Sequence, residues 1–390
     1  MRKSTGIPVL DDMLRGGLED GSTTVLYHTP FINGALFAYH ICHHRLKSGD
    51  SVIYFTNTKR IFTIMEDAER FGWDMREYRE IGRLSFIDAY TPFMGLSGEG
   101  RYAVSDPTNP EEITSVLARA LEEHESGSLL VIDSLSTALD QCGVEVLDKL
   151  EDWGRLVTLY DASLLCVFAD WGYESQIRMR IEDFFENMIE LTSIERNVII
   201  GDIFTVRKVE GEVVESKRVP FKLMRPGGVR IYIPKILVTG PFHAGKTSVV
   251  HALSTRAVSV DRESTTVALD FGHVEFEGFY ADLFGTTGQQ RFDPILEQLG
   301  GEAIAVILVV DSTKPETFPR AIEMLRKARA YGLPCIVFAN KQDLPNALSP
   351  EEVRAKLGFG EEVPVVGTVA TTGEGVREGL RILLNTIFGG

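Results

Sequence analysis

The sequence predicts an α/β protein of two domains, each a mostly parallel sheet flanked by helices on both faces. The chain has 390 residues, of which 44% are hydrophobic and 25% charged, so it is too long for one typical core and apolar enough for two. Short apolar runs alternate with helix-like stretches, which is typical of parallel sheets. A glycine-rich phosphate-loop pattern then follows a new apolar run near residue 240, which predicts a second sheet.

Four short apolar runs in the first 170 residues are predicted strands, separated by helix-like stretches. The strands are Val25–Tyr27, Val52–Phe55, Leu129–Ile132 and Leu164–Phe168, and the clearest helices are Glu111–Glu123 and Val144–Thr158. Between Ile199 and Val219, apolar and charged residues alternate around Glu210-Gly211-Glu212, which predicts a β-hairpin at an antiparallel edge. The turn residues Pro226-Gly227-Gly228 follow. We therefore expect two domains, residues 1–230 and 231–390.

Composition argues against several classes of partner. The chain has 40 Lys and Arg against 56 Asp and Glu, a net charge of −16, so it gains nothing by releasing counterions from a phosphate backbone, and nucleic acid is not an expected partner. The longest apolar runs, such as Ile304–Val310, fall far short of the ~20 residues that cross a bilayer, so no integral membrane association is expected. Arg2 stands where myristoylation needs glycine, and we expect a cytoplasmic protein. Four scattered cysteines are predicted to be reduced core thiols: Cys42, Cys142, Cys166 and Cys335.

A phosphate loop is predicted at residues 240–247, Gly-Pro-Phe-His-Ala-Gly-Lys-Thr, between the apolar run Ile236–Val238 and an apparent helix. The G-x-x-x-x-G-K-[ST] pattern requires this strand-to-helix context. Its glycines let backbone N–H groups wrap the phosphates, Lys246 reaches the β- and γ-phosphate oxygens, and the Thr247 hydroxyl takes one position on Mg²⁺. The other nucleotide-binding residues predicted here are Gly240, His243, Ala244, Gly245 and Ser248.

A base-reading motif is predicted at Asn340-Lys341-Gln342-Asp343, which follows the apolar strand Cys335–Ala339. A carboxylate accepts from two donors, and guanine offers N1–H and N2–H on one edge where adenine offers neither, so Asp343 would select GTP or GDP. The backbone N–H of Ala370, in the later run Ala-Thr-Thr-Gly, is expected to meet the guanine O6. The predicted ligands are therefore GTP or GDP with Mg²⁺.

In this order, and with Thr265-Thr266 and Gly288-Gln-Gln-Arg-Phe292 between them, the segments resemble the Ras/Arf superfamily of small GTPases over about 155 residues. The resemblance implies that Thr266 closes on Mg²⁺, with Thr265 as the alternative, and that Gly288 contacts the γ-phosphate. It also implies that Gln289 orients the attacking water, so that Lys246, Thr266 and Gln289 are the catalytic residues. Slow intrinsic turnover and activation by a protein regulator are expected. Arg262 is an alternative internal activator, although a solvated loop charge is favoured.

One departure from the family lies three residues before Gly288, where most members carry aspartate and this chain has Gly285. A shifted alignment on Asp282 is rejected because the spacing from Thr266 and the run Gly-Gln-Gln-Arg-Phe both fit the first register. The change removes a carboxylate behind Mg²⁺. It is similar to the prokaryotic MglA-like branch, which implies a roadblock-fold partner.

The first half resembles KaiC/RecA-like ATPases over about 230 residues, through Ser4–Leu14 and Leu129–Ser136, so both domains are expected to be of the P-loop type. Its phosphate loop breaks the pattern, because Asn33-Gly34-Ala35 stands where the family has Gly-Lys-Thr. Residues 56–59 replace the paired glutamates that activate water. We expect an ATPase domain that no longer hydrolyses ATP, with weak nucleotide binding as the alternative, and we expect Asp133 to cap the following helix. The resemblance leaves a ring-like homo-oligomer open.

The predicted function is a regulatory, signalling GTPase with switch regions around Thr266 and Gly285–Arg291. It hydrolyses GTP to GDP and phosphate, and the first domain is its scaffold or responder. The alternative is a GTP-loaded assembly or binding module with little turnover. Gly285 favours the alternative, whereas Gln289 and Thr266 favour the switch.

Overall fold

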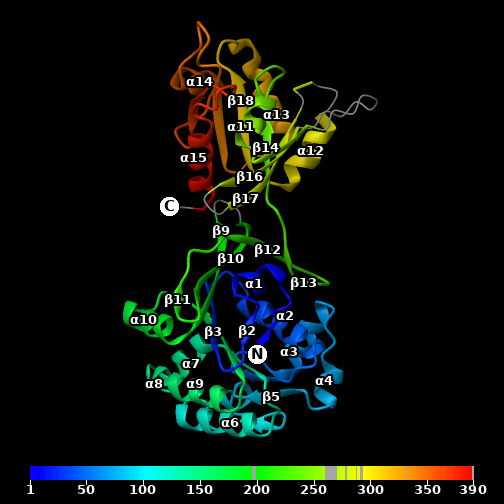
Figure 1. Cartoon of the computed structure of the whole chain (residues 1–390), viewed down its shortest axis with the longest axis vertical. Coiled ribbons are helices and arrows are strands. Elements are labelled where there is room, and N and C mark those ends of the chain that lie inside the picture. The colour runs from blue at the N-terminus through cyan, green and yellow to red at the C-terminus, as the bar shows by residue number, and fades with distance from the viewer. Residues whose placement is uncertain are drawn as a thin grey trace. The chain divides into compact units, whose positions relative to one another are not determined.

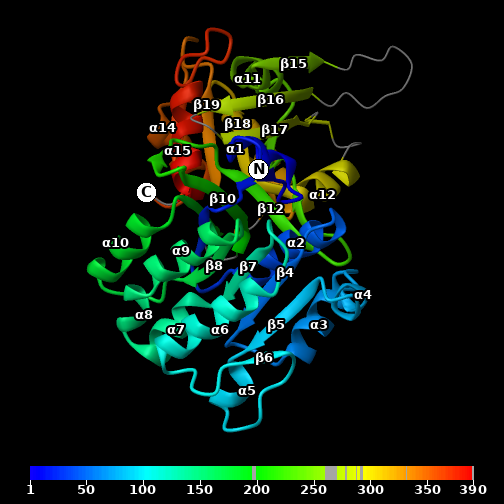
Figure 2. The ribbon, with the colours of Figure 1, turned by 60° about the horizontal axis from the view of Figure 1, so that its bottom comes forward.

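The computed structural model describes residues 1–195, 199–259, 270–276, 279–286, 288–289, 293–330 and 332–388. The chain divides into two compact units. The first unit holds residues 1–193 and 202–231, and the second holds 194–201 and 232–390. Helices cover both faces of the sheet in each unit (Figures 1 and 2). The α/β architecture expected from the sequence is confirmed.

The main sheet of the first unit has the strand order β13-β12-β10-β9-β3-β8-β7-β4-β5-β6, with β11 paired to β10. Strands β9, β3, β8, β7, β4, β5 and β6 run parallel. An antiparallel edge of β10, β11, β12 and β13 follows, and the hairpin predicted at Glu210-Gly211 is confirmed. A separate pair joins β1 and β2. The bounds are β1 (Arg2–Lys3), β2 (Leu18–Glu19), β3 (Thr23–His28), β4 (Val52–Thr56), β5 (Leu84–Asp88), β6 (Tyr102–Ala103), β7 (Leu129–Asp133), β8 (Ser163–Ala169), β9 (Asn187–Glu195), β10 (Ile199–Val209), β11 (Glu212–Val213), β12 (Val219–Met224) and β13 (Gly228–Ile231).

Alternating side chains of these strands build two cores, one on each face of the sheet. Val52 and Tyr54 pack with helices α1 to α4, whereas Ile53 and Phe55 pack with α6 to α10. The helix expected over Val144–Thr158 is two helices, α8 and α9. The bounds are α1 (Pro8–Met13), α2 (Gly34–Lys47), α3 (Ile61–Arg70), α4 (Arg76–Glu80), α5 (Tyr90–Phe93), α6 (Pro110–Glu122), α7 (Leu135–Cys142), α8 (Glu145–Asp148), α9 (Leu150–Leu159) and α10 (Ser175–Phe184).

The sheet of the second unit has the order β15-β16-β17-β14-β18-β19-β20, with β14 near its centre. Strands β17, β14, β18, β19 and β20 are parallel, and β16 is antiparallel to both β15 and β17. Val337 and Ala339 pack with α13 and α14, whereas the ring of Phe338 faces Gly379 of α15. The bounds are β14 (Lys235–Thr239), β15 (Arg256–Ser259), β16 (Asp270–Phe276), β17 (Phe279–Gly285), β18 (Ala303–Asp311), β19 (Cys335–Asn340), β20 (Val365–Thr368), α11 (Lys246–Leu253), α12 (Asp293–Glu302), α13 (Phe318–Lys327), α14 (Pro350–Leu357) and α15 (Val376–Phe388).

A buried ion pair fixes the start of the first unit. Arg45 of α2 is 1% exposed, and its Nε donates to Asp50 Oδ2 at 2.6 Å while its Nη2 donates to the carbonyl of Gly127 at 3.0 Å. Lys3 Nζ donates to the same carboxylate at 2.6 Å. Burial alone raises the pKa of Asp50, but the hydrogen bonds from Lys3 and Arg45 outweigh it and hold that pKa below its ordinary value. The ionised carboxylate therefore ties the N-terminus to α2.

Replacing Arg45 by methionine is expected to lower the unfolding free energy by about 3 kcal/mol, because it removes the buried cation of the pair and leaves Lys3 as the remaining donor to Asp50 and to the Gly127 carbonyl. Urea denaturation at pH 7 measures it. Arg155→Met is the control, since Arg155 pairs with Glu151 on an exposed helix face and should cost less than ~1 kcal/mol. The pKa of Asp50 is lowered, so its contribution is present at neutral pH and disappears as the pH falls through that lowered pKa. Equal losses in the two variants would contradict the assignment.

Candidate nucleotide site

The phosphate loop, residues 240–247, connects β14 to α11 and depends on two glycines. Gly240 has a φ of 146°, and a Cβ there would lie 2.0 Å from the carbonyl oxygen of Val309 on β18. Gly245 has a φ of 99°, and a Cβ there would lie 2.2 Å from the side-chain nitrogen of Asn340. The loop therefore approaches its neighbours more closely than any other residue would allow. His243, also at positive φ, is exposed at the rim of the loop.

Lys246 is curled into its own loop. Its side chain is 7% exposed, and Nζ donates to the carbonyl oxygen of Pro241 at 2.7 Å. Burial lowers the pKa of Lys246 to about 8, against an opposing effect of the Asp270 carboxylate. A desolvated ammonium bonded to a backbone carbonyl is suited to exchange that partner for phosphate oxygens.

Thr247 has a partner that the sequence analysis missed. Its Oγ1 donates to Asp270 Oδ2 at 2.5 Å, and Asp270 is the first residue of β16. A hydroxyl backed by a carboxylate is an oxygen donor set of the kind that Mg²⁺ prefers, so the residues present fit this metal. Ser248, also predicted, is half-buried in the first turn of α11. Asp270 could have been suggested by the two short strand-like runs on either side of Glu277-Gly278. When these strands pair as β16 and β17, Asp270 lies opposite Gly285.

Asn340 joins the phosphate loop to the base-reading segments. Its Nδ2 donates to the carbonyl oxygen of Ala244 at 2.9 Å. Its Oδ1 accepts from the backbone N–H of Ala370 at 3.0 Å and from Thr368 Oγ1 at 3.2 Å. Three segments predicted separately therefore converge at one place. The Ala370 N–H, expected to meet guanine O6, already donates to Asn340 and would have to be shared with the base.

Lys341 is oriented by a second carboxylate that was not predicted. Its Nζ donates to Asp311 Oδ2 at 2.6 Å, and its backbone has a φ of 70°. Asp311 ends the buried strand β18, a position that could have suggested it. Burial raises the pKa of Asp311, but the bonds from Lys341 and Thr313 hold it below the ordinary value. The carboxylate of Asp343, predicted to read the base, is exposed.

Part of the predicted switch apparatus reaches the loop. Gly288 is buried, and a Cβ on it would lie 2.1 Å from the backbone nitrogen of Phe242, so this glycine lies directly against the phosphate loop. Gln289, next to it, is half-buried. Four predicted residues lie outside the described residues: Arg262, Thr265, Thr266 and Arg291.

The strand register decides between the two alignments of the second switch. On β17, Gly285 lies opposite Val238, close to where β14 enters the phosphate loop. Asp282 lies opposite Lys235, three residues away and therefore about 10 Å further from the loop. Asp282 accepts a hydrogen bond from His273 Nδ1 at 3.0 Å instead. Gly285 is thus the residue at the phosphate end of the strand.

The corresponding loop of the first unit is filled by its own side chains. Asn33 Oδ1 accepts from the backbone N–H of Leu36 at 3.2 Å and so caps α2. His28 is 7% exposed, and its ring is so close that a Cβ on Gly34 would lie 2.5 Å from it. Burial lowers the pKa of His28, which favours the neutral ring. The ring of His28 therefore occupies space beside Gly34, and the N–H of Leu36 at the helix end is already bonded.

The expectation that Asp133 caps α7 is wrong. Ser134 is the cap, because its Oγ accepts from the backbone N–H of Thr137 at 3.1 Å. Asp133 Oδ2 instead accepts from the hydroxyl of Tyr54 at 2.6 Å, on the neighbouring strand β4. Burial raises the pKa of Asp133 despite this bond. The carboxylate of Asp133 therefore bonds the hydroxyl of Tyr54 on the neighbouring strand and not the N-terminus of α7.

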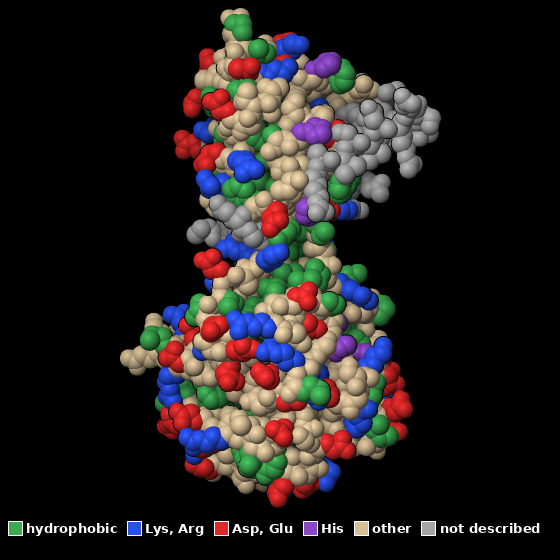
Figure 3. All heavy atoms as spheres, viewed as in Figure 1, with side chains coloured by type: hydrophobic (Ala, Val, Ile, Leu, Met, Phe, Trp, Pro, Cys, Tyr) green, Lys and Arg blue, Asp and Glu red, His purple; other side chains and the backbone are tan. Residues whose placement is uncertain are grey.

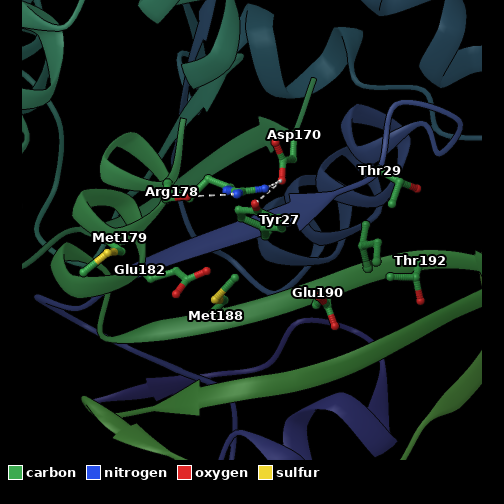
Figure 4. Close-up of a pocket in the computed structure, with 11 residues that line it drawn as sticks. Tyr27, Thr29, Asp170, Arg178, Met179, Glu182, Met188, Glu190 and Thr192 are labelled. Carbon is green, nitrogen blue, oxygen red and sulfur yellow. Dashed lines mark hydrogen bonds and ion pairs between the residues drawn. The ribbon is translucent and has the colours of Figure 1, made fainter. Parts of the chain in front are cut away.

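A cavity of about 490 Å³ opens beside β3 and β9 in the first unit. Figure 4 shows Tyr27 and Arg178 both directed at Asp170 in this cavity. The hydroxyl of Tyr27 donates to Asp170, and Arg178 Nη1 lies 3.7 Å from its Oδ2. The arginine therefore faces a carboxylate instead of the open space, an arrangement that does not favour a phosphate.

Charge is mixed over the face of the first unit in Figure 3, where Lys and Arg side chains are interspersed with Asp and Glu. Among the described residues, the structure contains no cluster of three or more His, Cys, Asp or Glu side chains that could hold a metal ion. Within the same part of the chain, every helix is too short or too polar to cross a membrane.

Comparison with known proteins assigns a family to each part of the chain. The model of the KaiC family, described as ATPase, matches residues 3–236, and that of the ADP-ribosylation factor family matches residues 232–387. A UPF0273 protein of Methanopyrus kandleri is 32% identical over 136 residues, covering 35% of this chain and 54% of the relative. A UPF0273 protein of Pyrococcus furiosus is 31% identical over 137 residues, covering 35% and 55%. The chain thus spans about half the length of the curated relatives it matches. A solved KaiC-like protein of Pyrococcus horikoshii has a TM-score of 0.49 and 19% identity, covering 60% of this chain and 99% of that one.

Above pH 8, Lys246 is expected to take up a proton when the protein binds a nucleotide. Without a ligand, Lys246 loses its proton as the pH rises through about 8, and phosphate restores the charged form, so affinity should fall through the same range. Calorimetry in two buffers of different ionisation enthalpy should show uptake of up to about one proton per nucleotide at pH 9, and little at pH 7. Lys246→Arg stays charged and should show none. Equal uptake in both proteins would refute the assignment.

Proposed function

The chain belongs to the KaiC family, and we propose that its working nucleotide site nevertheless lies in the second unit, where GTP is bound and hydrolysed to GDP and phosphate. The observation that carries the proposal is the side chain of Asn340, which bonds Ala244 of the phosphate loop and Ala370 of the loop after β20. A base read by Asp343 and phosphates held by residues 240–247 would thereby belong to one ligand.

In this proposal each residue keeps a simple task. Lys246 exchanges its bond to the Pro241 carbonyl for β- and γ-phosphate oxygens, and backbone N–H groups of the loop donate to the same phosphates. Thr247 and Thr266 would hold Mg²⁺, which supplies positive charge to the phosphate oxygens when bound. Gly288 lies against the loop, where a γ-phosphate would meet its N–H, and Gln289 beside it orients the attacking water.

We further propose that residues 1–230 form a scaffold or responder that does not hydrolyse ATP, and residues 231–390 the GTPase. The loop at Asn33-Gly34-Ala35 has no lysine or hydroxyl for a triphosphate, and His28 fills its interior. Slow intrinsic hydrolysis would then be accelerated by a protein regulator, for which a roadblock-fold protein is the candidate carried by the resemblance. A homo-oligomer built on the KaiC-like part is compatible with this role.

Base selection tests the site most directly. Asp343→Asn turns one of the two acceptors into a donor, so the variant should lose GTP and gain xanthosine triphosphate, which has a carbonyl where guanine has its amino group. Equilibrium binding of GTP, ATP and xanthosine triphosphate, beside Lys246→Ala, measures it. We expect wild-type protein to bind GTP alone and Lys246→Ala to bind none of the three. ATP binding that persists in both variants would place an active site in the first unit.

The rate of GTP hydrolysis distinguishes a cycling switch from a GTP-loaded assembly module. Gly285 favours the assembly module. Gln289→Leu removes the group that orients water, so in a cycling GTPase hydrolysis should fall by at least about tenfold while GTP affinity stays unchanged. Single-turnover phosphate release measures the rate, and filter binding measures the affinity. An unchanged rate would support a GTP-loaded module and refute the switch.

A further inference from the structure

The side chain of Asp270 occupies the space that a side chain at position 285 would need. Asp270 and Gly285 lie directly opposite each other on the antiparallel strands β16 and β17. A Cβ on Gly285 would lie 2.8 Å from Asp270 Cβ and 3.3 Å from its Oδ2. Contacts below 3.0 Å essentially never occur for Cβ atoms. An aspartate at position 285 and Asp270 in its present position therefore exclude each other.

The same carboxylate reaches the phosphate loop from two strands away. Strand β17 lies between β16 and β14, and Gly285 stands opposite Val238 at the loop end of β14. Because position 285 has no side chain, Asp270 extends past it to the first turn of α11. There its Oδ2 accepts from Thr247 Oγ1 at 2.5 Å.

We propose that Asp270 supplies, from the neighbouring strand, the carboxylate that most small GTPases carry at the position of Gly285. The inference rests on the proposed function, since it concerns the Mg²⁺ of that site. Because Asp270 accepts a hydrogen bond from the Thr247 hydroxyl, the lone pairs of Thr247 Oγ1 are left for the metal. The second oxygen of the Asp270 carboxylate can accept a hydrogen bond from a metal-bound water. Asp270 is thus a positioning residue, and the carboxylate is relocated and not lost.

A purely structural role has a different signature. A carboxylate bonded to Thr247 also stabilises the N-terminus of α11, because it lies at the positive end of the helix. Removing such a contact would weaken nucleotide binding equally at every Mg²⁺ concentration. Removing a group that positions metal ligands raises the Mg²⁺ concentration that binding requires. The Mg²⁺ dependence therefore distinguishes the two roles.

Asp270→Asn is the first variant, since it keeps the size of the side chain and removes its charge. The readout is the dissociation rate of a fluorescent GDP analogue from the full chain across a Mg²⁺ titration. We expect the half-maximal Mg²⁺ concentration to rise about 10–100-fold, the usual effect of losing a group that orients metal ligands. Asp282→Asn is the matched control on β17, bonded to His273 and distant from the loop, and should match wild type.

Exchange of the two residues is the second test. Gly285→Asp alone should impair Mg²⁺-dependent retention, because its Cβ conflicts with Asp270. Asp270→Gly combined with Gly285→Asp should recover most of the retention that either single change loses. An unchanged Mg²⁺ requirement in Asp270→Asn, or faster release by the same factor at all Mg²⁺ concentrations, would overturn the inference alone. A wild-type chain that binds no GTP or GDP at any Mg²⁺ concentration would overturn the proposed function itself.

Discussion

The amide of Asn340 is the contact on which the second unit's site depends. Its donor and its acceptor point in different directions, so one side chain bonds the carbonyl of Ala244 and the N–H of Ala370 at once. A carboxylate or an alkyl group has no equivalent pair. The parallel register of β14, β18 and β19 brings these loops to one edge of the sheet, which is where ligands bind in such folds. The glycine at 245 follows from the same contact, since any side chain there would collide with the amide.

The two units place different side chains inside equivalent loops. In the first, the buried ring of His28 lies against Gly34, and Asn33 caps the helix by accepting from the N–H of Leu36. In the second, the loop closes on Lys246, whose burial lowers its pKa to about 8, so that a bound phosphate would stabilise its charged form. An uncharged ring can be buried without a charged partner, whereas a buried cation costs free energy that a bound anion offsets.

Most of the architecture could be predicted from the sequence because it depends on local patterns. The apolar runs from Val25 to Phe168 became strands, and the hairpin at Glu210-Gly211 formed where alternation and turn residues agreed. The partners of the predicted site residues depend instead on how the strands are arranged beside one another. Asp270 meets Thr247 only through the register of three strands, and Asp133 turns to Tyr54 because the neighbouring strand presents a hydroxyl. Both contacts depend on which strands lie side by side in the sheet, which residue spacing alone does not encode. The base-reading role of Asp343 and the residues around Thr266 remain predictions.

The contact between Gly285 and Asp270 also constrains the history of the site. With the present backbone, carboxylates at both positions would bring their Cβ atoms within 2.8 Å of each other. If a carboxylate were moved from β17 to β16 by single substitutions, the first would have to be lost before the second was gained. Such an order of changes would pass through a chain with neither carboxylate, in which the metal would be held less strongly. Relocation by single substitutions would therefore be open only to a protein that could for a time tolerate looser retention of its nucleotide.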